Sequence, residues 1–173
     1  FSNCDVQLYE TKGTLDAYFA TVPNCPVKNL VDLVSRGELH KSVFSDMEAC
    51  SRLENPLSSP EYMQKIIAGL RLREKVFAEM GRHKLDFLCY PHQQILVEPI
   101  ANGTQNGRNG ILASVIGFPA LTVPGGFSAP SAKAPLGVPI GFEFLARPYR
   151  ENDLLSIGYA FEQATHFRKP PAL

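Results

Sequence analysis

The stretch from Arg108 to Leu145 limits the possible folds of this chain more than any other part of its sequence. A short run of small and apolar residues ends at Gly117, which can supply a left-handed helix C-cap, and Pro119 prevents the helix from continuing. The apolar run 120–123 has the length of a strand and is closed by a Pro-Gly-Gly turn. The pattern therefore predicts a short helix followed directly by a buried strand.

A second strand is predicted over Val138–Leu145, after a proline-rich loop. Val138, Ile140, Phe142 and Phe144 recur at period two, so they share one face, while Leu145 lies on the other. Helix, buried strand, loop and strand form a core unit. Because helices and strands alternate along the chain, the fold class is predicted to be α/β.

The first third of the chain, residues 1–57, predicts a helical and irregular lead-in. The stretch Phe1–Thr21 has helical spacing, and Gly13 is expected to interrupt it. Further on, Asn29 can cap a short helix that runs through Arg36.

Residues 58–171 predict a core with the order helix, strand, helix, strand, strand, helix. Its first helix begins at Ser58-Ser59-Pro60-Glu61, where a serine cap, a proline at the first helical position and an acid in the first turn coincide. An apolar stripe of this helix is expected to face a sheet, and it consists of Met63, Ile66, Ile67, Leu70 and Phe77.

The remaining elements of this core are a strand and a helix. The strand is expected over Leu85–Tyr90 and ends at Pro91, and the last helix begins at Glu151. The buried stripe of that helix is expected to be Leu154, Ile157, Gly158 and Phe161. One domain over residues 1–173 is the simplest organisation.

Composition excludes several classes of function. The chain has 173 residues, 45% of them hydrophobic and 20% charged, which is typical of a globular protein. Its formal net charge is zero, which gives no electrostatic case for binding nucleic acid or an anionic membrane. The longest apolar runs are far shorter than a membrane span. The chain begins at Phe1 with no Met, signal peptide or basic leader, so we expect a fragment of a longer protein.

The four cysteines, Cys4, Cys25, Cys50 and Cys89, are scattered and form no CxxC pair. Reduced thiols are the favoured interpretation, because a disulfide framework is denser in small secreted domains. The compartment is left open, with the cytoplasm favoured. Asn102 begins a formal glycosylation sequon, but such triplets also arise by chance in cytosolic proteins, so glycosylation is left open.

Three blocks of the second half carry a resemblance to a known family. The segments GFPALTVPGGF, GVPIGFEFLARP and LLSIGYAFEQATHFRKPP resemble, in this order and spacing, the C-terminal part of the amidase signature enzymes, and most of all the long fungal-type amidases. The resemblance is specific over Leu85–Pro171 and thinner over Phe1–Arg82. It implies an α/β fold with a large mixed sheet flanked by helices, of which this chain supplies the C-terminal segment.

The resemblance also implies a chemistry that this chain does not contain. In that family a serine nucleophile, a second serine on a cis peptide and a lysine base hydrolyse an amide C–N bond, and all three lie upstream of the region that resembles this chain. The pair Ser58-Ser59 lies at a helix start without a glycine-rich context and is not a candidate. We therefore expect an amidase fragment that is inactive alone and, within the intact enzyme, a small amide substrate and no cofactor. The alternative is a non-catalytic structural or interaction remnant.

Other catalytic interpretations are weaker. Cys89, Tyr90 and His92 cluster after a strand, but a thiol in an apolar run is more often a buried structural cysteine than a nucleophile. No metal is expected, because His40, His83, His92 and His166 show no ligand spacing. No nucleotide-binding glycine motif is present.

The best candidates for a site are polar residues around the turn after the strand at 85–90. His92, Gln93 and Gln94 stand on this turn, and the resemblance implies that it lies over the substrate cleft. A surface turn is an equally good interpretation. Arg108 and Asn109 are further candidates for substrate binding, although Asn109 can also cap the helix that follows. The expected macromolecular partner is the N-terminal part of the same enzyme or a second copy of this chain.

Overall fold

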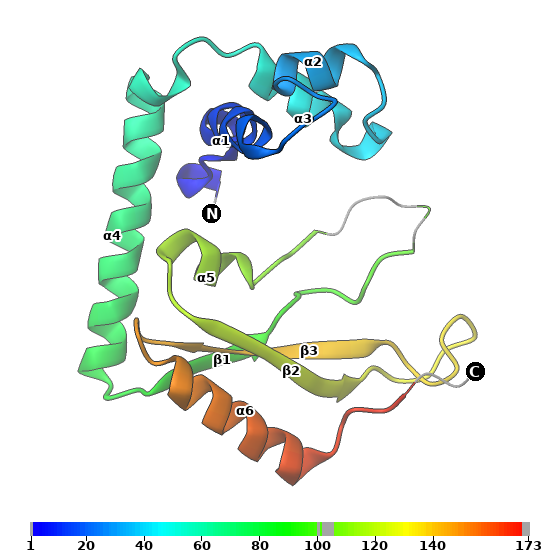
Figure 1. Ribbon diagram of the computed structural model, residues 1–173. Coiled ribbons are helices and arrows are strands. Elements are labelled where there is room, and N and C mark those ends of the chain that lie inside the picture. Colours follow the sequence, from blue (N-terminus) through cyan, green and yellow to red (C-terminus); the bar gives the residue numbers. More distant parts are fainter. Residues whose placement is uncertain (1, 100, 102–105, 171–173) are drawn as a thin grey trace. The chain divides into compact units, whose positions relative to one another are not determined.

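The computed structural model describes residues 2–99, 101 and 106–170 (Figure 1). Contacts between residues divide the chain into two compact units, Phe1–Leu70 and Arg71–Leu173. Each is described by itself, and the organisation as one domain stays a prediction. The predicted sequon at Asn102 lies outside the described residues. In the described ranges no helix is both long and apolar enough to cross a bilayer.

The first unit is helical. It contains the short 3-10 helices η1 (Ser2–Cys4) and η2 (Pro56–Ser58), three α-helices and the first half of α4 (Pro60–Arg82). The three helices are α1 (Gln7–Thr21), α2 (Leu30–Ser35) and α3 (Lys41–Ser51). The predicted break at Gly13 is wrong, because α1 runs through it. One glycine costs a helix interior only about 1 kcal/mol, which its neighbours in a long helix can offset.

Two predicted helix starts in this unit are confirmed by their capping bonds. The backbone N–H of Asp32 donates to Asn29 Oδ1 at 2.9 Å at the start of α2. The N–H of Tyr62 donates to Ser59 Oγ at 3.1 Å, and α4 then begins with Pro60 as predicted. Both side chains satisfy an N–H that the first helical turn leaves without a partner.

The second unit is a three-stranded antiparallel sheet with helices on both faces (Figure 1). The strands are β1 (Phe87–Pro91), β2 (Ala120–Phe127) and β3 (Pro139–Ala146), in the order β1-β3-β2. The helices are the second half of α4, α5 (Ile111–Ile116) and α6 (Glu151–Thr165). The chain thus has the predicted α/β class.

The two faces of this sheet carry separate cores, as the period-two pattern of β3 predicts. Phe144 and Ala146 pack with Leu154 of α6 on one face, where Ile157 and Phe161 of α6 also contact the cluster. Leu145 lies on the other face with Met80 of α4 and Ile116 of α5. The predicted helix stop is confirmed as well, because Gly117 has φ +65° and caps α5.

Strand β2 is longer than predicted. It does not end at the Pro-Gly-Gly turn but continues to Phe127, with a register shift between Pro124 and Gly126. A Cβ placed on Gly125 would lie 2.8 Å from Phe142 Cβ, so only glycine lets the two strands approach this closely. The Pro-Gly-Gly sequence therefore forms a bulge within the strand.

The buried face of α4 is not the predicted one. Four of the five predicted stripe residues are exposed, namely Met63, Ile67, Leu70 and Phe77. In the second unit α4 instead packs through Leu72, Val76 and Met80, which recur every four residues on another side of the helix. Arg147 fixes this arrangement by donating to the carbonyls of Met80 and Leu85 at 3.0 and 2.9 Å.

Candidate functional site

All five predicted site residues lie in two loop segments that run side by side. The segment 92–94 leaves β1, and the segment 107–110 leads into α5. Gln93 and Arg108 form an antiparallel bridge, and the N–H of Gln94 donates to the Gly107 carbonyl at 2.7 Å. The sequence places these segments about a dozen residues apart, and the structure brings them together.

Asn109 holds this pair of loops together. Its side-chain Nδ2 donates to the Pro91 carbonyl at 2.9 Å, and its Oδ1 accepts from Gln94 Nε2 at 2.9 Å. It does not cap α5 with its side chain, because the N-cap position is Gly110. Both polar ends of the Asn109 amide are thus used inside the turn, which points to a structural role for this residue.

His92 is held by a buried carboxylate that is not among the residues predicted from the sequence. Its Nδ1 lies 2.6 Å from Oε2 of Glu143, whose residue is only 3% exposed. Glu143 lies at the centre of β3, and its direct cross-strand neighbours are Tyr90 on β1 and Thr122 on β2. The sequence does contain a signal for this residue, because Glu143 is an acid in the middle of an apolar strand. A charge that is buried there requires hydrogen-bond partners.

The neighbouring strands supply those partners. The Tyr90 hydroxyl donates to Glu143 Oε1 at 2.7 Å, and Thr122 Oγ1 lies 3.4 Å from Oε2. Burial, together with the carboxylate beside it, raises the pKa of Tyr90 above its ordinary value. The phenol consequently keeps its proton and remains a donor to Glu143 at physiological pH.

Glycines make room for the His92 ring. A Cβ placed on Gly110 would lie 2.5 Å from His92 Nδ1, which is closer than atoms can approach. On β3, a Cβ on Gly141 would lie 3.5 Å from His92 Cβ and 3.0 Å from Thr122 Cγ2. The ring therefore fits against backbone on its Gly110 side, and a larger residue there would displace it.

Two predictions concern Cys89: that it is buried, and that it does not form a catalytic pair with His92. Cys89 is exposed, so its prediction as a buried cysteine is wrong. It pairs with Phe144 and so lies on the α6 face of the sheet, where α6 packs mainly on β2 and β3. His92 is bonded to Glu143, not to Cys89.

Gln93 has a buried side-chain Oε1 with no hydrogen-bond partner in the described part of the chain.

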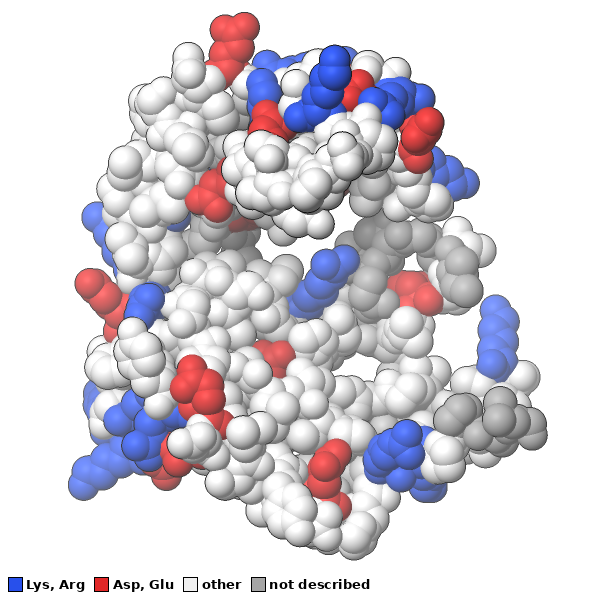
Figure 2. Space-filling view, in the orientation of Figure 1, with Lys and Arg blue, Asp and Glu red and all other residues white. Residues whose placement is uncertain are grey.

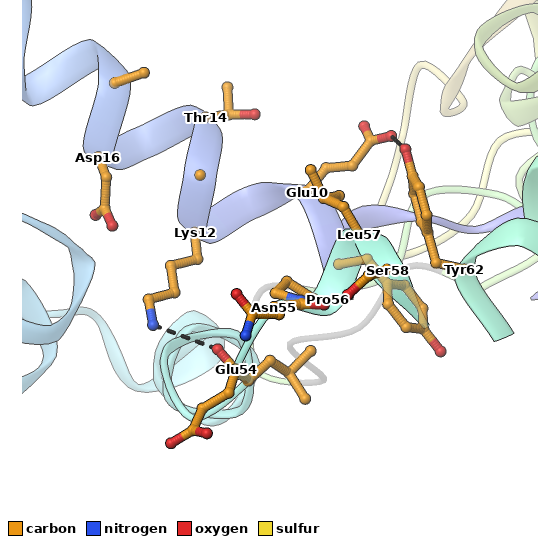
Figure 3. A pocket seen from close by; sticks show the side chains of 14 residues that line it. Glu10, Lys12, Thr14, Asp16, Glu54, Asn55, Pro56, Leu57, Ser58 and Tyr62 are labelled. Carbon is orange, nitrogen blue, oxygen red and sulfur yellow. Dashed lines mark hydrogen bonds between the residues drawn. The ribbon is translucent and has the colours of Figure 1, made fainter. Parts of the chain in front are cut away.

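A second candidate is a cavity of about 1140 Å³ in the first unit, between α1 and the segment 53–62 (Figure 3). Several of its polar groups are paired with protein atoms. Tyr62 donates to Glu10 Oε1 at 2.8 Å, which raises the pKa of Tyr62, and Lys12 Nζ donates to the Leu53 carbonyl at 3.3 Å. A large cavity without converging reactive groups is a weaker site than the cluster around His92.

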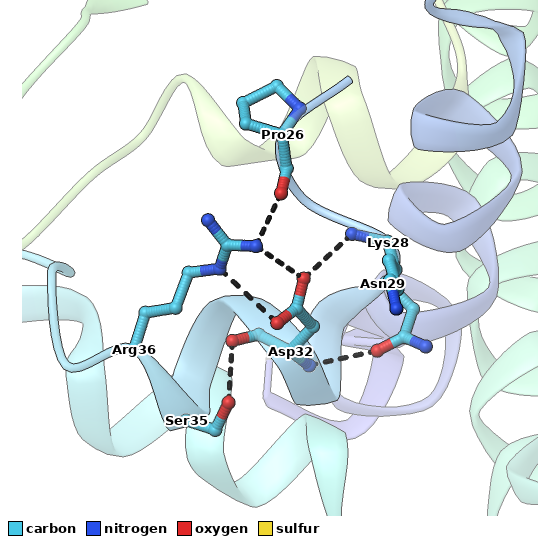
Figure 4. A network of polar contacts seen from close by, with 6 residues as sticks. All are labelled: Pro26, Lys28, Asn29, Asp32, Ser35 and Arg36. Carbon is cyan, nitrogen blue, oxygen red and sulfur yellow. Dashed lines mark hydrogen bonds and ion pairs between the residues drawn. The ribbon is translucent and has the colours of Figure 1, made fainter. Parts of the chain in front are cut away.

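A third polar cluster, around Asp32, is structural (Figure 4). The Asp32 carboxylate accepts from the backbone N–H of Lys28 at 2.9 Å and from Arg36 at 2.9 Å, and Arg36 also donates to the Pro26 carbonyl. These bonds from Arg36 and Lys28 hold the pKa of Asp32 below its ordinary value. The bonds to Lys28 and Pro26 tie the loop 26–29 to α2, so the cluster stabilises a helix start.

Surface charge does not single out another site. On the visible face, acidic and basic side chains are interspersed (Figure 2), in keeping with the formal net charge of zero. Among the residues with described positions, no three His, Cys, Asp or Glu side chains are grouped as a metal site would require. The cluster of His92 and Glu143 is thus the candidate that the geometry favours.

No family model matches the chain, but curated proteins and solved structures do. It is 25% identical to a probable amidase from Arabidopsis thaliana over 95% of this chain and 29% of that protein. It is also 38% identical, over 35% of this chain and 11% of that protein, to a glutamyl-tRNA(Gln) amidotransferase subunit from Desulforudis audaxviator.

Among solved structures, a peptide amidase from Stenotrophomonas maltophilia matches with a TM-score of 0.77 and 29% sequence identity. The match covers 95% of this chain and 33% of that one. The chain therefore spans about a third or less of the proteins it resembles. Its fold is the α/β fold of one part of the peptide amidase structure, and the relatives named above are a probable amidase and an amidotransferase subunit.

Proposed function

We propose that this chain is the C-terminal part of an enzyme that hydrolyses amide C–N bonds with a serine, a second serine and a lysine. Its role is to complete the sheet of that enzyme and to form one wall of the substrate pocket. The observation that carries this proposal is the match to the peptide amidase, because it extends over nearly the whole chain in both sequence and structure. The relatives named above come from a plant and from bacteria, and the fungal-type assignment remains a prediction.

Within this role, the residues of the substrate-binding loops are His92, Gln93, Gln94, Arg108 and Asn109. The geometry supports different roles for these residues. Asn109 and Gln94 bond to each other and to the backbone, so they hold the loops, while His92 keeps one ring nitrogen for a ligand. Functional side chains on loops held by a rigid sheet are typical of binding sites.

The chain alone is proposed to be inactive, because the three catalytic residues that the resemblance implies are not found in its sequence. Loss of a catalytic serine or its base lowers turnover by roughly a millionfold in serine hydrolases. A purified chain should hydrolyse no aryl amide above the buffer rate. Turnover that survives replacement of Ser58 and Ser59 but disappears in Cys89→Ala would instead assign a thiol mechanism.

A chimera tests the role in the intact enzyme. The third of the Stenotrophomonas peptide amidase that matches this chain is replaced by residues 1–173, and hydrolysis of a peptide amide is measured. We expect activity above that of a truncated amidase that lacks this third. A chimera that melts cooperatively yet hydrolyses nothing would contradict the proposal and favour the structural remnant, as would an upstream coding sequence without the Ser-Ser-Lys set.

A further inference from the structure

We propose that Glu143, supported by Tyr90, holds His92 as the Nδ1–H tautomer, so that Nε2 is presented as a hydrogen-bond acceptor for the N–H of a carboxamide substrate. Glu143 and Tyr90 are then positioning residues, and His92 is the residue that contacts the substrate. The choice of a carboxamide as the ligand rests on the proposed function. The assignment of the tautomer rests on the geometry of the cluster alone.

The hydrogen bond between His92 and Glu143 decides which ring nitrogen carries the proton. An ionised carboxylate can only accept hydrogen bonds, and Glu143 Oε2 lies 2.6 Å from His92 Nδ1. Nδ1 must therefore be the donor. Tyr90 donates to the other oxygen at 2.7 Å, and because its pKa is raised it remains protonated. This donor on the neighbouring strand orients the carboxylate toward His92.

The opposite ring nitrogen, Nε2, is not used by the protein residues that the structure describes. His92 Nε2 makes no hydrogen bond to any residue whose position is described. It is also not one of the fully buried polar atoms without a partner, so it is not sealed from solvent. The side chain is 38% exposed, whereas that of Glu143 is 4% exposed. Nε2 therefore keeps some access to solvent, while Nδ1 of the same ring is anchored in the sheet by Glu143. This arrangement, with one nitrogen fixed by a carboxylate, determines the role of the other.

The protonation of the ring decides which ligand Nε2 can bind. In a neutral ring held as Nδ1–H, Nε2 has a lone pair and no proton, so it can only accept. A primary or secondary carboxamide offers an N–H to such an acceptor, but an ester of the same shape offers none. A site built to bond an N–H rejects the analogue that lacks it, because the polar atom of the site then loses its partner. The cluster should therefore distinguish amides from esters.

Nuclear magnetic resonance of the chain with ¹⁵N-labelled histidine tests the tautomer directly. Spectra are recorded at about pH 9, well above the ordinary imidazole pKa of about 6.5. His92→Gln identifies the resonances of His92 among those of His40, His83 and His166. We expect a protonated Nδ1 and an unprotonated Nε2 in the wild type. A protonated Nε2 would overturn the inference.

Two variants separate positioning from general disruption. In Glu143→Gln the side-chain amide can either accept or donate, so His92 should shift toward a mixture of tautomers. In Tyr90→Phe the carboxylate remains, so the Nδ1–H form should persist even if the protein is less stable. Equal spectra for wild type and Glu143→Gln would contradict the positioning role of Glu143. The wild-type spectrum alone is decisive if the Gln variant does not fold.

The ligand is tested with benzamide and methyl benzoate as matched probes. Benzamide should shift the His92 Nε2 resonance in a saturable way, while the ester should not, and His166 serves as the internal reference. Equal shifts by both probes, or by neither, would overturn the choice of ligand. A chimera without amidase activity overturns the proposed function and leaves the tautomer standing, whereas an Nε2–H ring overturns the inference alone.

Discussion

Among the described residues, Glu143 is the one charged side chain that is buried. Its two carboxylate oxygens lie at hydrogen-bond distance from Tyr90, His92 and Thr122, so the removal of a donor leaves part of a buried charge without compensation. The donors are not equivalent. Tyr90 bonds at 2.7 Å, while Thr122 is exposed and lies 3.4 Å away.

Tyr90→Phe should therefore lower the free energy of unfolding by about 1–3 kcal/mol, the usual cost of leaving a buried acceptor without its donor. Thr122→Val is the control, and it should change the same quantity by no more than about 0.5 kcal/mol because a long contact at an exposed position contributes little. Urea unfolding at neutral pH measures both. If the two variants are equally stable, the Tyr90 hydroxyl does not support Glu143.

Asp32 offers a test that depends on pH. Its pKa is lowered in the folded state by Arg36 and the Lys28 backbone, so its ionised form stabilises the fold. This contribution is complete above the unfolded value of about 3.9 and is lost as the pH falls through the lower folded value. Asp32→Asn should flatten the loss of stability below about pH 4 in acid unfolding curves. Arg36→Gln should flatten the same interval, and a double variant that adds their effects would contradict a shared network.

At the scale of elements, two glycines in helices test how α1 and α5 are built. Gly13 lies inside α1 with no atom within 4 Å of a Cβ placed on it, so Gly13→Ala should stabilise the protein by about 0.5–1 kcal/mol. Gly117 has φ +65° at the end of α5, where Gly117→Ala should destabilise by about 1–2 kcal/mol. Thermal unfolding compares the two. If both variants shift the melting temperature in the same direction, the backbone at one of the two glycines does not have the conformation described here.

At the scale of the whole molecule, an open sheet edge and exposed apolar side chains predict association. In the described part of the sheet, β2 pairs with β3 alone, which leaves its other edge free to recruit a strand. We expect the isolated chain to self-associate or to bind the upstream part of its enzyme, with the molar mass from light scattering rising with concentration. Ala120→Lys, at an exposed position of β2, should reduce this association, because an edge lysine disfavours strand pairing. A dilution-resistant monomer that binds no hydrophobic dye would contradict the prediction.

The sequence by itself determined the features that depend on neighbours along the chain. The cap at Asn29, the start of α4 after Ser59 and the end of α5 at Gly117 are local events, because a side chain or a backbone angle acts within four residues. The two faces of β3 followed from its period of two. The turn that carries His92 and Gln94 was also visible, since it follows a strand ended by proline.

Where the sequence offered several equally good contacts, only the tertiary structure decided which of them forms. Glu143 lies 51 residues from His92, and no local rule pairs them until β1 and β3 are in register. Likewise, α4 has two apolar sides at helical spacing, and packing against Ile116 and Leu145 chose the side of Met80. Cys89 is exposed, on the face of the sheet where α6 packs mainly on β2 and β3. These outcomes depend on burial, which is a property of the assembled elements and not of any one of them.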